Sequence, residues 1–202
     1  MPDAEQKPEV VRLFIALPVP AAVKEELQRL QAELRRKLPS DCVRWTRPEQ
    51  SHLTLRFLGN VAVDQVEELS AAVRAVCNNF APLQLRAERI GFFPQIRFPR
   101  VIWAWVHDDR EQLRLLQTAL QEATASFTRE KAEKDFTGHL TIGRTQSMKS
   151  AQARILGDLA QEMVDRVFGE WTADTVEIIR SELSSSGSRY FRVAEIPLGG
   201  GK

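Results

Sequence analysis

Two nearly identical four-residue strings, half a chain apart, constrain this 202-residue sequence more than any other feature. His52-Leu53-Thr54-Leu55 lies in the first half and His139-Leu140-Thr141-Ile142 in the second, and together they use two of the three histidines. Each string lies in an apolar segment typical of a β-strand. Because successive side chains of a strand point to opposite faces, each histidine shares a face with its threonine, while the aliphatic residues face the other way. One copy in each half predicts a shared site.

The segments around the two strings alternate between helix and strand patterns. Apolar residues at steps of three and four predict helices over 21–38, 64–76, 109–127 and 151–163. Apolar or alternating runs predict strands over 12–17, 43–46, 52–58, 83–90, 100–106, 137–144, 175–179 and 190–196. Gly59-Asn60 is predicted to end the strand of the first string, and 92–99, which holds two prolines, is predicted to be a loop.

Strands interleaved with helices in two similar halves predict an α+β fold with antiparallel sheets and helices on the outer faces. Each half is too small to bury a core unaided, and no linker divides them. We therefore predict a single domain over 11–198. It is flanked by a flexible N-terminus at 1–10 and a flexible, glycine-rich tail at 199–202.

The overall charge excludes some classes of protein. With 28 Lys and Arg against 27 Asp and Glu, the formal charge is +1, which disfavours a protein that coats nucleic acid but permits a site for one phosphate. No stretch approaches the roughly 20 apolar residues of a membrane span. The polar first nine residues do not resemble a signal peptide, and Cys42 and Cys77, which lack ligand spacing, are predicted to be reduced thiols. We expect a cytoplasmic protein without membrane association.

The paired histidines and threonines suit one kind of chemistry. Two imidazoles on opposite sides of a reacting atom can act as base and acid. Two hydroxyls are neutral donors that can hold two oxygens of a tetrahedral anion. If the two halves pack with these faces together, the four residues predict phosphodiester chemistry without a metal or other cofactor. Two alternatives stay open: each histidine is a buried core residue, or the pair belongs to a zinc site, although neither string holds a third ligand.

Residues near the strings are candidates for the same site. Arg144 has the charge to hold a phosphate, but strict alternation places it on the wrong face unless a bulge re-aims it. Phe14 is predicted to face the cleft and to stack on a base, with core packing as the alternative. Arg56 shares a face with His52; a solvated edge residue is the favoured interpretation, with a contact to the substrate strand as the alternative. The third histidine, His107, precedes Asp108 and is predicted to lie in a loop that caps a helix.

The sequence resembles the two-histidine (2H) phosphoesterase superfamily, and within it the RNA 2′,3′-cyclic phosphodiesterase group, also described as 2′-5′ RNA ligases. The likeness spans about residues 11–198. Besides the two strings, it is carried by Arg12-Leu13-Phe14-Ile15-Ala16-Leu17, Val43-Arg44-Trp45, Phe57-Leu58-Gly59, Phe93-Pro94, Ser181-Glu182-Leu183, Gly187 and Tyr190. One departure is Gly138, which stands where the family usually has a proline before the second string.

The resemblance implies a bilobal fold, with two pseudo-symmetric lobes and an active-site cleft between them. It implies hydrolysis of 2′,3′-cyclic phosphodiester ends of RNA, or of 2′,3′-cyclic nucleotides, to 2′-phosphomonoesters, with a reversible 2′-5′ ligase activity as a related reaction. His52 would be the proton donor and His139 the proton acceptor, with Thr54, Thr141 and Arg144 binding the phosphate. No metal or cofactor is implied, and we expect a monomer.

Two other functions remain open from the sequence. The first is a non-catalytic module that binds RNA ends, for which Gly138 is the only support. The second is a phosphodiesterase that acts on 2′-5′ oligonucleotides, as some relatives in the superfamily do.

Overall fold

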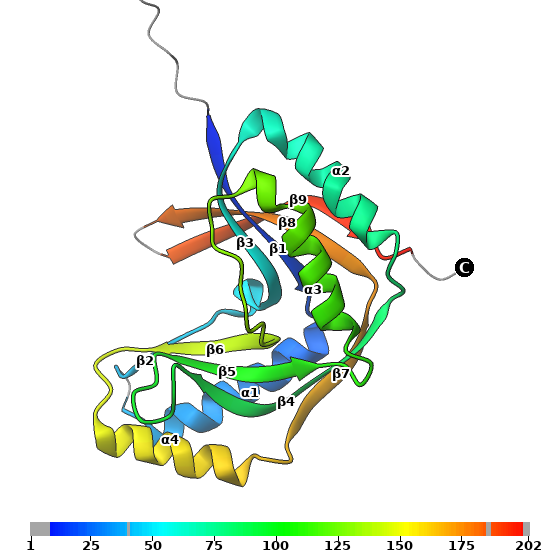
Figure 1. Cartoon of the computed structure of the whole chain (residues 1–202). Coiled ribbons are helices and arrows are strands. Elements are labelled where there is room, and N and C mark those ends of the chain that lie inside the picture. Colours follow the sequence, from blue (N-terminus) through cyan, green and yellow to red (C-terminus); the bar gives the residue numbers. More distant parts are fainter. Residues whose placement is uncertain (1–8, 40, 185–186, 200–202) are drawn as a thin grey trace, which may run out of the picture.

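The computed structural model describes residues 9–39, 41–184 and 187–199. It contains two antiparallel sheets, which lie in separate lobes (Figure 1). The four strands of the first sheet, in spatial order, are β3 (His52–Ala62), β1 (Val10–Pro18), β8 (Thr175–Ser184) and β9 (Gly187–Pro197). The five strands of the second are β2 (Val43–Trp45), β6 (His139–Thr145), β5 (Val101–His107), β4 (Leu83–Phe93) and β7 (Val167–Ala173). The predicted α+β class with antiparallel sheets is confirmed.

Four α-helices cover the outer faces of the two sheets (Figure 1). They are α1 (Ala21–Lys37), α2 (Val66–Cys77), α3 (Gln112–Ala123) and α4 (Ser150–Glu162). Helices α2 and α3 pack on the first sheet, whereas α1 and α4 pack on the second. Helix α1 follows β1 of the first sheet yet contacts β7 of the second, and α3 follows β5 of the second sheet yet contacts β3 of the first. The lobes are therefore not the two halves of the sequence, because each half supplies elements to both.

Most buried apolar side chains of both sheets form one connected cluster, and Phe14, Ala16 and Ile179 form a second, smaller one. Leucines of α1 contribute at steps of three and four, as the sequence predicts, and they join side chains from the strands beneath them. Burial of such side chains is the main favourable term in folding, so the shared core keeps the two sheets in a defined relation. This shared core therefore fixes the relative position of the two walls of the cleft.

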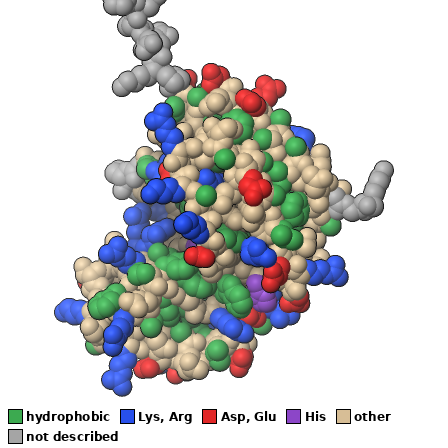
Figure 2. Space-filling view, in the orientation of Figure 1, with side chains coloured by type: hydrophobic (Ala, Val, Ile, Leu, Met, Phe, Trp, Pro, Cys, Tyr) green, Lys and Arg blue, Asp and Glu red, His purple; other side chains and the backbone are tan. Residues whose placement is uncertain are grey.

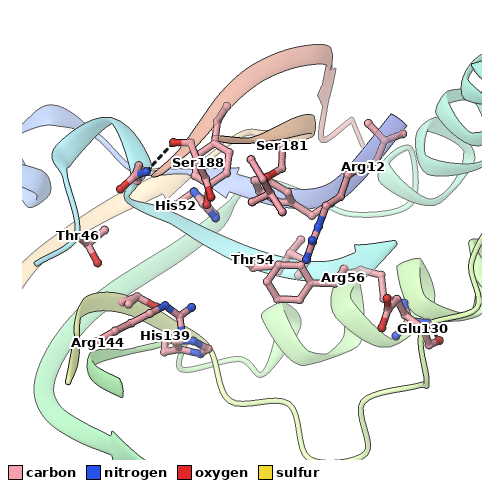
Figure 3. Close-up of a pocket in the computed structure, with 18 of the residues that line it drawn as sticks. Arg12, Thr46, His52, Thr54, Arg56, Glu130, His139, Arg144, Ser181 and Ser188 are labelled. Carbon is pink, nitrogen blue, oxygen red and sulfur yellow. Dashed lines mark hydrogen bonds between the residues drawn. The ribbon is translucent and has the colours of Figure 1, made fainter. Parts of the chain in front are cut away.

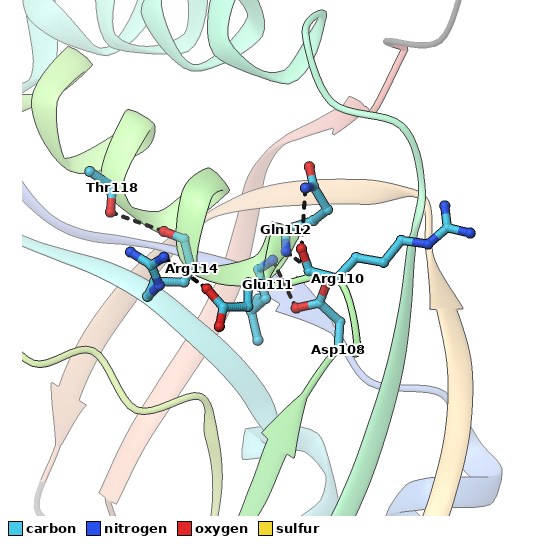
Figure 4. Close-up of polar contacts among 7 residues, drawn as sticks. Asp108, Arg110, Glu111, Gln112, Arg114 and Thr118 are labelled. Atoms are coloured by element: carbon cyan, nitrogen blue, oxygen red, sulfur yellow. Dashed lines mark hydrogen bonds and ion pairs between the residues drawn. The ribbon is translucent and has the colours of Figure 1, made fainter.

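The N-terminus of α3 is capped by an aspartate, as predicted. Asp108 Oδ2 accepts a hydrogen bond from the backbone N–H of Gln112 at 2.7 Å, and Oδ1 accepts one from Leu113 at 3.1 Å (Figure 4). A carboxylate at this position satisfies helix N–H groups that have no intrahelical partner. His107 ends β5 immediately before this cap and lies outside the cleft described below.

Several element boundaries differ from the prediction. The sequence does not predict strand β7, because apolar and polar residues do not alternate cleanly in Val167–Ala173. In the structure Gly169 lies within this strand with a φ of 147°. Strand β3 runs past Gly59, which adopts a φ of 65°, to Ala62, so the glycine marks an irregularity within the strand rather than its end. The turn Val63–Gln65 replaces the predicted start of α2. Ile155, predicted on the buried face of α4, is 37% exposed, because the buried stripe follows Ala153, Leu156 and Leu159.

The predicted flexible ends fall partly outside the described residues. Residues 1–8 and 200–202 are the ones that lie outside them. Val10 already pairs with Ala62 in the β1–β3 ladder, and the Gly199 N–H donates to the Cys77 carbonyl at 3.2 Å. The predicted link over 184–188 includes residues 185–186, which also lie outside the described residues.

Candidate active site

The two strings lie in different sheets and face one another. His52 and Thr54 stand on β3 of the first sheet, and His139 and Thr141 on β6 of the second. In both strands the aliphatic residues of the string are fully buried, whereas the histidine and threonine are half-buried. A cleft of about 820 Å³ between the sheets is lined by all four polar residues, with the two histidines on opposite walls (Figure 3). The structure therefore brings together the pairs that strand alternation placed on equivalent faces.

Arg144 reaches the same cleft because β6 contains a bulge. Strand β5 pairs Ile102 with Gly143 and Trp103 with Thr141, which leaves Ile142 without a partner in this ladder. One extra residue in a strand reverses the alternation that follows it. Arg144 consequently lies on the His139 side, beside that imidazole (Figure 3). The sequence showed that such a bulge was needed but not that it exists.

The equivalent bulge in β3 explains the position of Arg56. Strand β1 pairs Ile15 with Arg56 and Ala16 with Thr54, so Leu55 is the extra residue. The Arg56 side chain is 6% exposed and donates to the Lys131 carbonyl at 2.8 Å and the Glu130 carbonyl at 2.9 Å. The prediction of a solvated edge residue is wrong, since Arg56 is buried and anchors the loop that borders the cleft.

Phe14 lies on the cleft side of β1 but is 3% exposed. Its ring centroid is 4.7 Å from that of His52, 5.2 Å from Tyr190 and 6.0 Å from Phe57. The ring therefore borders the cleft and is also packed among other side chains, so it leaves no broad face on which a nucleotide base could stack. Phe14 instead supports the His52 imidazole from behind.

The environment of His52 keeps its imidazole neutral in the free protein. Burial lowers the pKa of His52 from 6.5 to about 4, and the positive charges of Lys24 and of protonated His139 act in the same direction. A backbone hydrogen bond at Gln50 opposes them. A negatively charged ligand between the histidines would offset the burial and raise this pKa.

His139 is held in one tautomer. Its Nδ1 donates to the Thr137 carbonyl at 2.8 Å, which leaves the Nε2 lone pair free. Burial is the largest cause that lowers the pKa of His139, and Arg144 lowers it further, whereas the bond to Thr137 raises it. A neutral imidazole with a free, oriented nitrogen is the form that a general base requires.

Gly138 is required by a close approach of two strands. A Cβ at this position would lie 2.4 Å from the Val106 carbonyl oxygen, while the Gly138 carbonyl accepts a hydrogen bond from the Val106 N–H at 2.8 Å. Any side chain here would force β5 and β6 apart. The packing of β5 against β6 therefore accounts for the glycine at this position. Gly138 gives no support to the alternative of a non-catalytic module that binds RNA ends.

Several cationic and aromatic side chains line the cleft. No local sequence pattern predicted that they would lie there. Figure 2 shows Lys and Arg side chains gathered at the hollow between the lobes. Besides Arg144, the cations that line the cleft are Arg12, Arg44, Arg56 and Lys131. Tyr190, from β9, packs edge-on against His52 at 5.2 Å between centroids. The near-neutral net charge of the chain does not predict this local excess of positive charge, because the fold decides where charged side chains lie.

Gln50 links the first wall of the cleft to the β8–β9 hairpin. Its Nε2 donates to the Ser188 carbonyl at 2.8 Å, shown by a dashed line in Figure 3. The segment just before β3 is thereby tied to the strand that supplies Tyr190. Nothing in the local sequence indicates this contact, because its partners are far apart in the chain.

Comparison with known proteins agrees with this geometry. A model of the family described as LigT like phosphoesterase matches residues 17–103. An Aquifex aeolicus protein named RNA 2′,3′-cyclic phosphodiesterase is 28% identical over 197 residues, which cover 95% of this chain and 100% of that protein. The crystal structure of TT0787 from Thermus thermophilus has a TM-score of 0.76 at 26% identity, over 94% of this chain and 98% of that one. The chain is similar to LigT-like phosphoesterases.

The fold of this chain is shared beyond these sequence relatives. The crystal structure of E. coli LigT complexed with 3′-AMP has a TM-score of 0.70 at only 20% identity, over 94% of this chain and 99% of that one. The resemblance identified from the two strings is thus confirmed. The second string lies outside the residues matched by the family model, and it is the fold that sets it opposite the first.

Two other kinds of feature are absent from the part of the chain that the structure describes. Among these residues, no three His, Cys, Asp or Glu side chains come together as they would to bind a metal ion. Within the same ranges, no helix is long and apolar enough to cross a membrane.

Proposed function

We propose that this protein hydrolyses 2′,3′-cyclic phosphodiester ends of RNA to 2′-phosphomonoesters, without a metal ion. One observation carries the proposal: two imidazoles, each accompanied by a threonine, line opposite walls of one cleft beside Arg144. The name of the Aquifex aeolicus relative, RNA 2′,3′-cyclic phosphodiesterase, supports the same reaction.

In the proposed reaction, His139 Nε2 takes a proton from water while the water oxygen attacks the phosphorus atom. The bond from phosphorus to the 3′ oxygen breaks, and His52 gives its proton to that oxygen. Thr54, Thr141 and Arg144 bind the other phosphate oxygens and stabilise the charge that develops on them. The products are a 2′-phosphate and a 3′-hydroxyl group, so atoms and charges balance.

His52 must be protonated for its role, although its pKa is about 4 in the free protein. The bound phosphate supplies the opposite charge that raises this pKa, so the donor is charged when substrate is present. A 5′-hydroxyl that replaces water in the same attack would form a 2′-5′ linkage. The proposed ligase activity therefore needs no further catalytic group.

The test is incubation of the purified protein with 2′,3′-cyclic AMP in excess EDTA, followed by chromatography. We expect turnover that the chelator does not change and 2′-AMP as the product. Formation of 3′-AMP would contradict the assigned leaving group, and loss of turnover that Mg²⁺ or Zn²⁺ restores would contradict metal independence. Cleavage of a 2′-5′ oligoadenylate in preference to the cyclic nucleotide would favour the alternative substrate.

A further inference from the structure

An exposed aromatic ring stands in the cleft where the core does not require it. Phe57 is 58% exposed, yet it lines the cleft with His52 and Thr54 because the β3 bulge turns it to that side. Its centroid is 6.0 Å from that of Phe14, which is itself 4.7 Å from His52. Phe57 therefore offers an open ring face one aromatic ring away from the reacting centre.

A cation without a carboxylate partner lies at the same end of the cleft. Arg12, on β1, is exposed and points into the pocket toward β3 (Figure 3). Two other arginines of this sheet are paired with carboxylates, Arg180 with Glu182 and Arg192 with Glu177. Among the described residues, no carboxylate lies within ion-pair distance of Arg12. Its charge is available to a ligand.

The same end of the cleft also contains negative charge. Glu130 and Glu133 line it, and both belong to the loop that Arg56 anchors. The pKa of Glu133 is raised by burial, and the positive charge of Arg56 acts against that rise. Lys131, from the same loop, adds a further cation to the wall.

The cleft thus holds two separate places for an anion. Arg144 serves the phosphate between the histidines, whereas Arg12 lies on the other sheet, two residues along β1 from Phe14, which is the ladder partner of Phe57. A cyclic mononucleotide has one phosphate and fills only the first place. We propose that Phe57 and Arg12 form a subsite for the nucleotide that precedes the cyclic end, with its base stacked on Phe57 and its phosphodiester paired with Arg12. This inference rests on the proposed function and makes an oligonucleotide end the preferred substrate.

The test compares 2′,3′-cyclic AMP with a diadenosine dinucleotide that ends in a 2′,3′-cyclic phosphate. We expect the wild type to have the higher kcat/KM for the dinucleotide. Phe57→Ala should lower that value about 10-fold or more, since base stacking is worth roughly 1–3 kcal/mol, and should leave the mononucleotide value unchanged. Phe191→Ala, at an exposed phenylalanine of β9 outside the cleft, is the matched control and should change neither.

Arg12→Gln should lower kcat/KM for the dinucleotide and flatten its dependence on salt, because one phosphate contact is lost. Equal losses on both substrates would overturn the subsite, since Phe57 would then contact the terminal nucleoside or only support the fold. No loss on either substrate would overturn it as well. Failure of the proposed function would look different, because the wild type would then hydrolyse neither substrate.

A different observation concerns the bulge that aims Arg144. Gln31 of α1 is 7% exposed, and its Nε2 donates to the Ile142 carbonyl at 2.9 Å and to the Thr46 carbonyl at 2.8 Å. The Thr46 N–H donates to the same Ile142 carbonyl at 3.0 Å. Ile142 is the extra residue of the bulge, so Gln31 stabilises the backbone at the point where the strand changes face.

The geometry points to Gln31 as a positioning residue that acts through Arg144. Gln31→Leu is expected to lower kcat/KM about 10-fold, because a displaced Arg144 loses its geometry with the phosphate. In an Arg144→Ala background the same change should cause no further loss. Gln117→Leu, at a buried glutamine of α3, is the control and should leave activity unchanged.

Two further measurements separate positioning from simple destabilisation. Gln31→Leu and Gln31→Met should both weaken binding of inorganic phosphate, measured by calorimetry below the unfolding temperature, as Arg144→Ala does. If either variant of Gln31 binds phosphate and turns over substrate as the wild type does, the inference is wrong. Additive losses in the double variant would also contradict it, because Gln31 would then act by another route.

Discussion

Replacing His139 with alanine is expected to lower kcat about 10²- to 10⁴-fold, the usual worth of a positioned general base. The Nδ1 bond to Thr137 orients Nε2 toward the cleft, and alanine removes the only atom proposed to take the proton from water. His52→Ala should cause a loss of similar size, because the 3′ oxygen would leave without a proton. The double variant should lose less than the product of the two single effects, since the groups act in one step.

The control is the third histidine of the chain. His107 lies at the end of β5, against Trp105 and Glu88, and does not line the cleft. Steady-state hydrolysis of the dinucleotide by His107→Ala should match the wild type, provided that circular dichroism shows all variants folded. Near wild-type turnover by a folded His52→Ala or His139→Ala protein would remove the basis of the proposed mechanism.

Acidification is expected to destabilise the protein through His52. Its pKa is about 4 in the folded chain, against 6.5 for an unperturbed histidine, so the unfolded state binds more protons between these values. Stability that is fully present above pH 6.5 is therefore lost as the pH falls toward 4. The shift corresponds to up to about 3 kcal/mol in the free energy of unfolding, with burial as the main cause.

Urea unfolding at a series of pH values checks this expectation. The His52→Gln variant carries no titrating group at this position, so its free energy of unfolding should fall less than that of the wild type between pH 6.5 and pH 4. Phosphate should protect the wild type at acid pH, because the anion stabilises the charged imidazole. Parallel pH profiles for the two proteins would show that His52 is not held neutral by burial.

Sequence patterns predicted the local part of the structure well. The spacing of leucines predicted α1 within a residue of its observed ends, since an amphipathic helix carries its own periodicity. Within the two four-residue strings, alternation predicted which side chains are buried. Strand β7 was missed for the opposite reason, because its pattern is irregular and its place is set by pairing with β4.

The sequence by itself determined that two His-Thr pairs would share equivalent faces of two strands, because alternation is a property of the strand alone. Only the tertiary structure decided what surrounds them. Bulges opposite β1 and β5 turned Phe57 and Arg144 into the cleft, and Tyr190, from the far end of the chain, closed over Phe14. These outcomes depend on ladder register and on neighbours distant in sequence, which no local pattern encodes.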